Sequence, residues 1–214
     1  RAGRDPQDVR VLAVSKGHPA AAIHSAWEAG LRSFGENYVQ DWRSKADDTQ
    51  LQSLVGLRWH FVGALQRNKI RFLLGRVCSI ETIDRFTLAR ALSERAEARG
   101  QGQSVLIQVN LGREPSKAGF HPEEIEQGLG KLLECPGLAI EGLMSIPPRR
   151  ESAEATRQDH RELAGLRTRL EQRWSIALPE LSMGMSGDFE VAVEEGSTEV
   201  RLGTALFGPR PPRT

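Results

Sequence analysis

Short apolar runs alternate with longer amphipathic segments along the whole chain. The short runs are rich in β-branched residues, which is typical of buried strands. They predict strands over Val9–Val14, Arg32–Phe34, Arg58–Val62, Val77–Ile80, Ser104–Asn110, Ala139–Ile146, Glu180–Met183 and Glu199–Leu202. The segments between them repeat apolar residues at helical spacing. They predict helices over Pro19–Gly30, from Asn37 onward, and over Asn68–Leu74, Arg85–Arg99, Pro122–Glu134, Glu151–Arg173 and Asp188–Glu195.

The strand–helix units follow one another with no segment left over. Eight such units favour a parallel sheet closed on itself, so the sequence predicts an α/β fold, a single (β/α)₈ TIM barrel formed by residues 1–214. An open doubly wound sheet is the alternative, but it usually has fewer units and a glycine fingerprint after the first strand. The stretch Arg210-Pro211-Pro212-Arg213 is predicted to be a frayed terminus.

The composition of the chain excludes several classes of binding partner and indicates its cellular location. The 214 residues carry a formal net charge of +1, which argues against nucleic-acid or membrane-surface binding through a basic face. No apolar run has transmembrane length and nothing resembles a signal peptide, so a cytoplasmic protein is predicted. Cys78 and Cys135 lie in apolar stretches and are expected to be buried, reduced thiols. The histidines lack paired zinc-type spacing, which predicts no metal site.

Lys16 directly follows the first apolar run. Strand alternation places it on the same side as Leu12 and Val14, a set expected to face the barrel lumen. Functional groups of such barrels lie at the carboxyl ends of the strands. A lysine desolvated there has a lowered pKa and can attack an aldehyde. The competing interpretation is a solvated lysine at a strand–helix turn.

Two glycine-containing loops follow the last two predicted strands. Ser182-Met183-Gly184-Met185-Ser186-Gly187-Asp188 runs into a helix, and Arg201-Leu202-Gly203-Thr204 ends the final strand. Many barrels bind phosphate with these two loops, through backbone N–H groups and hydroxyl donors such as those of Ser186 and Thr204. Plain turns are the alternative.

Three other polar residues are open to two interpretations each. Inside a barrel mouth, Arg201 needs an anion or a ring nitrogen beside it, or an ion pair with a carboxylate such as Glu199. Asn37 follows the second strand, where it or Glu36 could reach the mouth or Asn37 could cap a helix. His60 in the third strand is either a site residue or a satisfied core histidine.

Taken together, the motifs resemble those of the pyridoxal-phosphate homeostasis proteins, relatives of the barrel domain of alanine racemase. The matching segments occur in family order and cover nearly the whole chain. They are VLAVSK around Lys16, FGENYVQ at 34–40, WHFVGALQRNK at 59–69, GLMSI at 142–146, SMGMSGDFEVAV at 182–193 and GSTEVRLGTALFG at 196–208. The sequence departs from the family pattern at Gly17-His18, Ala64 and Pro115.

The resemblance implies a fold-type III barrel that carries pyridoxal 5′-phosphate as a Schiff base on Lys16. It implies that Ser186, Gly203 and Thr204 hold the phosphate and that Arg201 lies near the pyridine nitrogen or the phosphate. The residues expected to complete the cofactor site are Asn37, His60, Met144, Ser182, Gly184 and Met185.

The chemistry favours a carrier over an enzyme. Arginine cannot accept the proton that a strong pyridine electron sink requires, and the only tyrosine is Tyr38, in the loop after the second strand. We therefore expect a monomeric carrier or buffer of pyridoxal phosphate that acts in its homeostasis and delivers it to apo-enzymes. A racemase or decarboxylase of the same fold is the main alternative, and a lysine aldolase acting on a sugar phosphate is a third.

Overall fold

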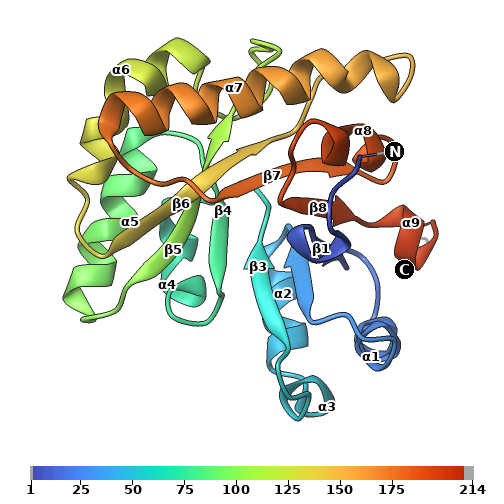
Figure 1. Ribbon diagram of the computed structural model, residues 1–214. Helices are drawn as coiled ribbons and strands as arrows, with labels where there is room; N and C mark the ends of the chain where they lie inside the picture. The colour runs from blue at the N-terminus through green and yellow to red at the C-terminus, as the bar shows by residue number, and fades with distance from the viewer. Residues whose placement is uncertain (1, 210–214) are drawn as a thin grey trace.

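The computed structural model describes residues 2–209, and in this part of the chain eight parallel strands close into a barrel (Figure 1). Each strand pairs with the next, and β8 returns to β1 with Arg201 opposite Leu12. The closed order confirms the predicted (β/α)₈ fold. The strands are β1 (Arg10–Val14), β2 (Ser33–Glu36), β3 (Arg58–Phe61), β4 (Ser79–Ile83), β5 (Gln103–Val109), β6 (Leu138–Ser145), β7 (Glu180–Met185) and β8 (Glu199–Leu202).

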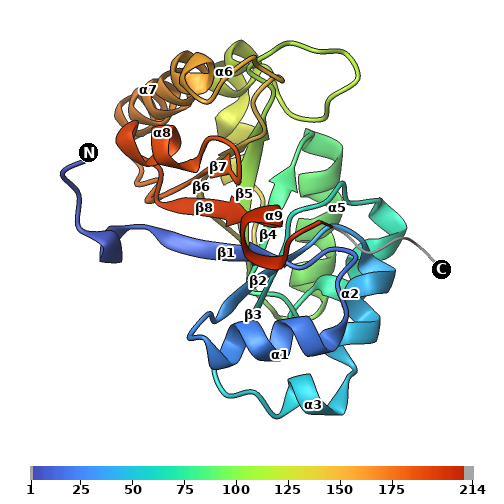
Figure 2. The ribbon, with the colours of Figure 1, turned by 90° about the vertical axis from the view of Figure 1, so that its right-hand side faces the viewer.

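Helices cover the outside of the barrel. In both views α6 lies beside α7 on one side of the molecule, and α1 lies near α3 on the opposite side (Figure 1, Figure 2). The α-helices are α1 (Ala20–Glu28), α2 (Val39–Ala46), α3 (Thr49–Gln52), α4 (Ile70–Leu73), α5 (Phe86–Ala98), α6 (Pro122–Leu133), α7 (Arg157–Trp174), α8 (Phe189–Glu194) and α9 (Thr204–Phe207). Short 3₁₀ helices are η1 (Pro6–Asp8), η2 (Arg67–Lys69) and η3 (Glu154–Thr156).

The barrel has a continuous apolar layer outside and a mixed interior. Outward-facing strand residues such as Phe34 and Ile107 pack with helix residues such as Leu92 and Leu163 in one buried cluster. Leu12, Val14 and Val62 form a separate small apolar cluster. Alternation places this second set on the lumen side, where it supports the carboxyl end of β1.

Most predicted boundaries differ from the observed ones by a few residues, and two differences have a clear physical reason. β4 begins two residues after Val77 and continues through Glu81 and Thr82, because both polar side chains are buried with hydrogen-bond partners inside the fold. The long helix predicted from Glu151 begins only at Arg157. The amide of Ala155 donates to Ser152 Oγ, and a 3₁₀ turn precedes α7.

The cysteine prediction was wrong about burial. Cys78 is exposed and Cys135 is half-buried, although both are free thiols. Cys78 precedes β4 at the amino-terminal end of the barrel, where it lines a cavity instead of the core. The predicted frayed stretch 210–213 lies outside the described residues. Among residues 2–209, no helix combines the length and the apolar character needed to cross a membrane.

Candidate functional site

A cavity of about 310 Å³ opens at the carboxyl ends of the strands. Its walls come from the ends of β1, β2 and β3 and from the segments after β6, β7 and β8. The lining residues are Val14, Lys16, His18, Asn37, Val62, Ile146, Met185, Ser186, Gly187, Arg201, Gly203 and Thr204. The structure thus brings seven of the predicted site residues to one cavity: Lys16, Asn37, Met185, Ser186, Arg201, Gly203 and Thr204.

Lys16 is aimed into the cavity by the alternation of β1. Leu12 and Val14 precede it on the same side and pack against Val62. Ser15 points the opposite way and is fully buried. Lys16 is half-buried and lines the cavity together with Val14 and Val62. The position is suited to an amine that reacts inside a partly dry pocket.

A buried ion pair behind β1 fixes the segment that carries Lys16. Lys45 Nζ donates to Glu36 Oε1 at 2.5 Å and to the carbonyl oxygen of Ser15 at 2.8 Å. The Ser15 hydroxyl donates to the same carboxylate oxygen at 2.7 Å. Burial raises the pKa of Glu36, although Lys45 and Ser15 oppose that rise. Glu36 therefore points behind the strand end and not into the mouth, contrary to one sequence expectation.

The sequence pattern predicted a helix from Asn37 onward but did not single out Lys45. The Lys45 side chain is only 9% exposed. Lys45 lies nine positions after Glu36, in a different element, so helical spacing did not link the two residues. A carboxylate buried at a strand end requires a cationic partner, so a buried Glu36 would have indicated that a lysine or arginine lies nearby.

The loops after β7 and β8 are joined through Ser186. Its hydroxyl oxygen accepts hydrogen bonds from the amides of Gly203 at 3.3 Å and Ala205 at 3.2 Å. Ser186, Gly187, Gly203 and Thr204 share one wall of the cavity. Amides and hydroxyl groups gathered on one wall form a suitable cradle for an anion.

A second buried pair holds the loop after β7 from behind. Asp188 Oδ1 accepts from the amide of Met185 at 2.7 Å, and Asp188 Oδ2 lies 3.0 Å from His160 Nε2 on α7. Burial alone would raise the pKa of Asp188, but these hydrogen bonds outweigh it and hold that pKa below its usual value. The sequence predicted a helix over Glu151–Arg173, and its many charged residues gave no sign of a buried His160.

Arg201 reaches the cavity from within the barrel. Nη1 donates to the carbonyl oxygen of Ser182 at 2.7 Å and to its hydroxyl at 2.8 Å, and Nη2 donates to the Ser145 carbonyl at 2.6 Å. Burial lowers the pKa of Arg201. Glu199, the expected alternative partner, instead accepts from Arg10 Nε at 2.7 Å.

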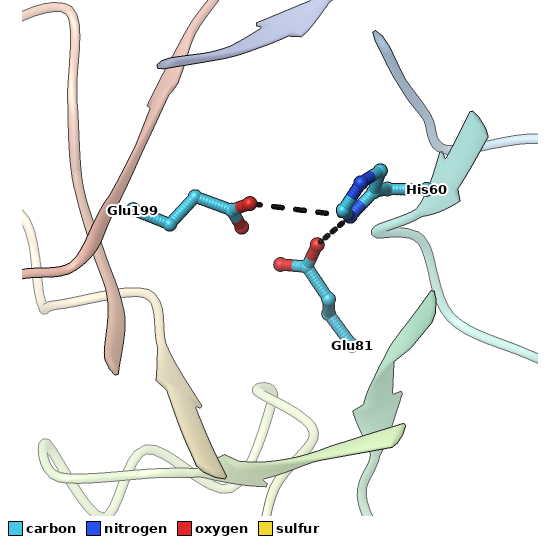
Figure 3. Close-up of side chains that lie close together, drawn as sticks. All are labelled: His60, Glu81 and Glu199. Carbon is cyan, nitrogen blue, oxygen red and sulfur yellow. Dashed lines mark hydrogen bonds and ion pairs between the residues drawn. The ribbon is translucent and has the colours of Figure 1, made fainter. Parts of the chain in front are cut away.

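Four predicted site residues do not line the cavity. Ser182 lies behind Arg201, and Met144 is its buried neighbour in the β6–β7 register. Gly184 has φ +93° at the register irregularity of β7, where a Cβ would clash with Ala192. His60 lies deeper in the lumen with Glu81 and Glu199, as Figure 3 shows. Its Nδ1 is 3.0 Å from Glu81 Oε1, as expected of a satisfied core histidine.

The group of His60, Glu81 and Glu199 has the composition of a divalent-cation site. Their ligand atoms lie within 4.8 Å of one another. However, Arg10 already donates to Glu199, and the charge of Arg201 acts on both carboxylates. Since these guanidinium groups already supply positive charge, the arrangement favours a network of hydrogen bonds over a metal centre.

The cavity wall contains a buried hydrogen-bond acceptor that a polar ligand can use. Asn37 Oδ1 is buried and accepts no hydrogen bond, although Asn37 lines the wall. Asn37 does not cap α2, whose first turn is preceded by Tyr38 without a side-chain bond. A buried acceptor without a donor is uncommon and is satisfied when a ligand supplies one. A small anionic molecule that also carries a hydrogen-bond donor fits these groups.

Comparison with known proteins gives one consistent result. The profile of the family described as alanine racemase, N-terminal domain, matches residues 3–211. A pyridoxal phosphate homeostasis protein of Aquifex aeolicus is 44% identical over 98% of this chain and 91% of its own. The pyridoxal phosphate homeostasis protein of Escherichia coli K12 is 42% identical over 98% of this chain and 89% of its own length. The structure of PipY from Synechococcus elongatus with PLP bound superposes with a TM-score of 0.88 at 39% identity, covering 97% and 96% of the chains.

Proposed function

Because the chain belongs to the family of the alanine racemase N-terminal domain, and resembles pyridoxal phosphate homeostasis proteins over nearly its whole length, we propose that it binds pyridoxal 5′-phosphate and acts in its homeostasis. The observation that carries this proposal is the meeting of Lys16 with the loops after β7 and β8 around one cavity of about 310 Å³. That volume is in the range of small-ligand sites.

The residues present fit the cofactor group by group. The amine of Lys16 would bond to the aldehyde carbon with loss of water. The amides and hydroxyl groups of Ser186, Gly203 and Thr204 would hold the phosphate, and Asn37 and Met185 would line the ring. Arg201 would contact the ring or the phosphate. When bound, the cofactor supplies an aldehyde and an electron-withdrawing ring.

Arg201 favours a carrier over an efficient catalyst. A guanidinium group has no acceptor atom, so it cannot take up and return the proton of a pyridine nitrogen. The ring would then be a weak electron sink. We propose a cytoplasmic monomer that sequesters the reactive aldehyde and releases it to apo-enzymes that require it.

Reconstitution with pyridoxal phosphate tests the binding role. The loaded protein should show a visible absorbance band, and borohydride reduction should fix the cofactor on a peptide containing Lys16. Lys16→Ala should lose the band, whereas Lys131→Ala on the exposed face of α6 should keep it. A band retained by Lys16→Ala would remove Lys16 from this role.

Transfer distinguishes a carrier from an enzyme. The loaded protein, mixed with an apo-enzyme that uses pyridoxal phosphate, should restore that enzyme's activity and lose its own band. Racemisation or decarboxylation of amino acids at ordinary enzymatic rates would refute the carrier role.

A further inference from the structure

The lumen beneath the cavity contains a hydrogen-bond network centred on Ser182. Its hydroxyl oxygen lies 2.8 Å from Arg201 Nη1, 2.8 Å from Glu81 Oε2 and 3.0 Å from Glu199 Oε1. Ser182 and both glutamates are fully buried. The two carboxylates therefore meet at one hydroxyl group directly behind an arginine that lines the cavity.

Counting protons shows that two ionised carboxylates do not fit this arrangement. A serine hydroxyl donates one hydrogen bond and accepts two. Arg201 Nη1 can only donate, so it uses one acceptor position of Ser182 Oγ. The hydroxyl proton serves one carboxylate, which leaves the other carboxylate oxygen facing a lone pair. All three contacts are satisfied when that second carboxyl group is protonated and donates to Ser182 Oγ.

We propose that Glu81 and Glu199 share one buried proton through Ser182, and that its loss in alkaline solution weakens the hold of Arg201 on an anionic ligand in the cavity. The second half rests on the proposed cofactor binding, whereas the first half does not. Ser182, Glu81 and Glu199 are thus positioning residues for Arg201, and Ser182 and Glu199 act on the cavity without lining it.

Glu199 is the carboxyl group that holds the proton. Burial and the neighbouring Glu81 raise the pKa of Glu199 to about 7. Burial would also raise the pKa of Glu81, but His60, Arg201 and Ser182 together hold it below its usual value. The charged and titratable groups that act on the pair come from five strands: Arg10 on β1, His60 on β3, Glu81 on β4, Glu180 on β7, and Glu199 and Arg201 on β8.

Of the two neighbouring cations, Arg10 has a fixed charge over the same pH range, whereas His60 titrates. Arg10 keeps its proton and bridges Glu199 to Glu180. Burial would lower the pKa of His60, but Glu81 and Glu199 raise it overall, so loss of the His60 proton adds to the same change in charge and is common to wild type and Glu199→Gln. Deprotonation of Glu199 therefore adds one uncompensated negative charge beneath Arg201. A charge about 10 Å from an anion at an effective dielectric constant of about 20 changes its affinity on the order of tenfold.

Glu199→Gln reproduces the protonated state at every pH. The amide oxygen can accept from Arg10, and the amide NH₂ can donate to Ser182 Oγ. Glu141→Gln is the matched control, because Glu141 lines the lower cavity and accepts from Ser104, and Ser182 is not among its hydrogen-bond partners. The ligand is 4-deoxypyridoxine 5′-phosphate, which has the ring and phosphate of the cofactor but no aldehyde, so that Lys16 chemistry does not contribute.

Two measurements test the proposal. Calorimetry should give equal dissociation constants for wild type and Glu199→Gln near pH 6, and an approximately tenfold weaker wild type near pH 8.5. Glu141→Gln should follow wild type. Infrared difference spectra, unliganded wild type minus Glu199→Gln, should show the carbonyl stretch of a protonated carboxylic acid near pH 6 and not near pH 8.5, because the contribution of Glu36, another buried carboxyl group with a raised pKa, cancels.

The outcomes separate the two parts of the argument. A difference spectrum without that carboxylic-acid band near pH 6 overturns the shared proton. A ratio of dissociation constants that does not change with pH overturns the coupling to the cavity. If the ligand fails to bind either protein at any pH while the infrared band is present, the proposed cofactor binding and its coupling fail and the shared proton stands.

Discussion

Replacing Lys45 by methionine should test how strongly the ion pair behind β1 stabilises the fold. Glu36 is fully buried, and Lys45 Nζ is its cationic partner at 2.5 Å. Methionine fills a similar volume but leaves the carboxylate uncompensated. Removing one partner of a buried pair costs about 3–5 kcal/mol. We expect a loss of this size in the free energy of unfolding near pH 8, measured by urea denaturation.

The destabilisation caused by Lys45→Met should depend on pH, because Glu36 can take up a proton. Burial already raises the pKa of Glu36, and removing Lys45 removes the main opposing influence. A carboxyl group whose pKa is raised in the folded state stabilises that state in acid and loses this contribution as the pH rises through the folded pKa. The cost of Lys45→Met should therefore shrink in acid, where Glu36 is protonated.

A double variant isolates the interaction. Adding Glu36→Gln to Lys45→Met should recover much of the lost stability, because no buried charge remains, and exposed Lys131→Met serves as the control. A loss below about 1 kcal/mol, or one independent of pH, would refute the reasoning.

Three further perturbations address the site from other directions. Asp188→Asn should lower the free energy of unfolding by about 1–3 kcal/mol and weaken binding of a phosphate-bearing ligand, because the bonds to Met185 and His160 lose their charge; calorimetry and urea denaturation check both. Gly63→Ala should lower the melting temperature and disturb Asn37, since its Cβ would lie 1.9 Å from the Asn37 carbonyl, whereas Gly102→Ala meets nothing within 4 Å and should be neutral. Glu199→Gln should stabilise the protein by on the order of 3 kcal/mol near pH 8 and little near pH 4 in urea denaturation, because wild type loses that stability as the pH rises toward the Glu199 pKa of about 7.

The sequence predicted the barrel well where residues followed the simple alternation of apolar and polar positions. β8 was predicted with its observed bounds, and the strand ends that carry Lys16 and Arg201 were located. β4 was truncated because Glu81 and Thr82 are polar residues in a buried strand. Hydropathy does not reveal that a polar side chain has a buried partner from another strand.

The residues that support the cavity from behind were not predictable in the same way. Lys45 and His160 each lie on a helix whose sequence reads as a charged, solvated face. Their partners, Glu36 and Asp188, lie nine and 28 positions away along the chain. Only the closed barrel brings α2 behind β1 and α7 behind the loop after β7. His60 was expected in the pocket from the family resemblance. Alternation could not correct that expectation, since it gives the side of a strand but not the depth in the lumen.

These buried supports hold three walls of the cavity in place before any ligand binds. Lys45 and Glu36 hold the Ser15 segment, Asp188 holds the Met185 amide, and Ser182 holds the Arg201 guanidinium. Each anchor is buried and acts on a different wall of the cavity. The entropy of ordering those walls is therefore lost during folding and not on ligand binding, which strengthens binding without additional ligand contacts. It follows that variants of these anchors should change affinity through wall mobility, while the residues that touch the ligand stay the same.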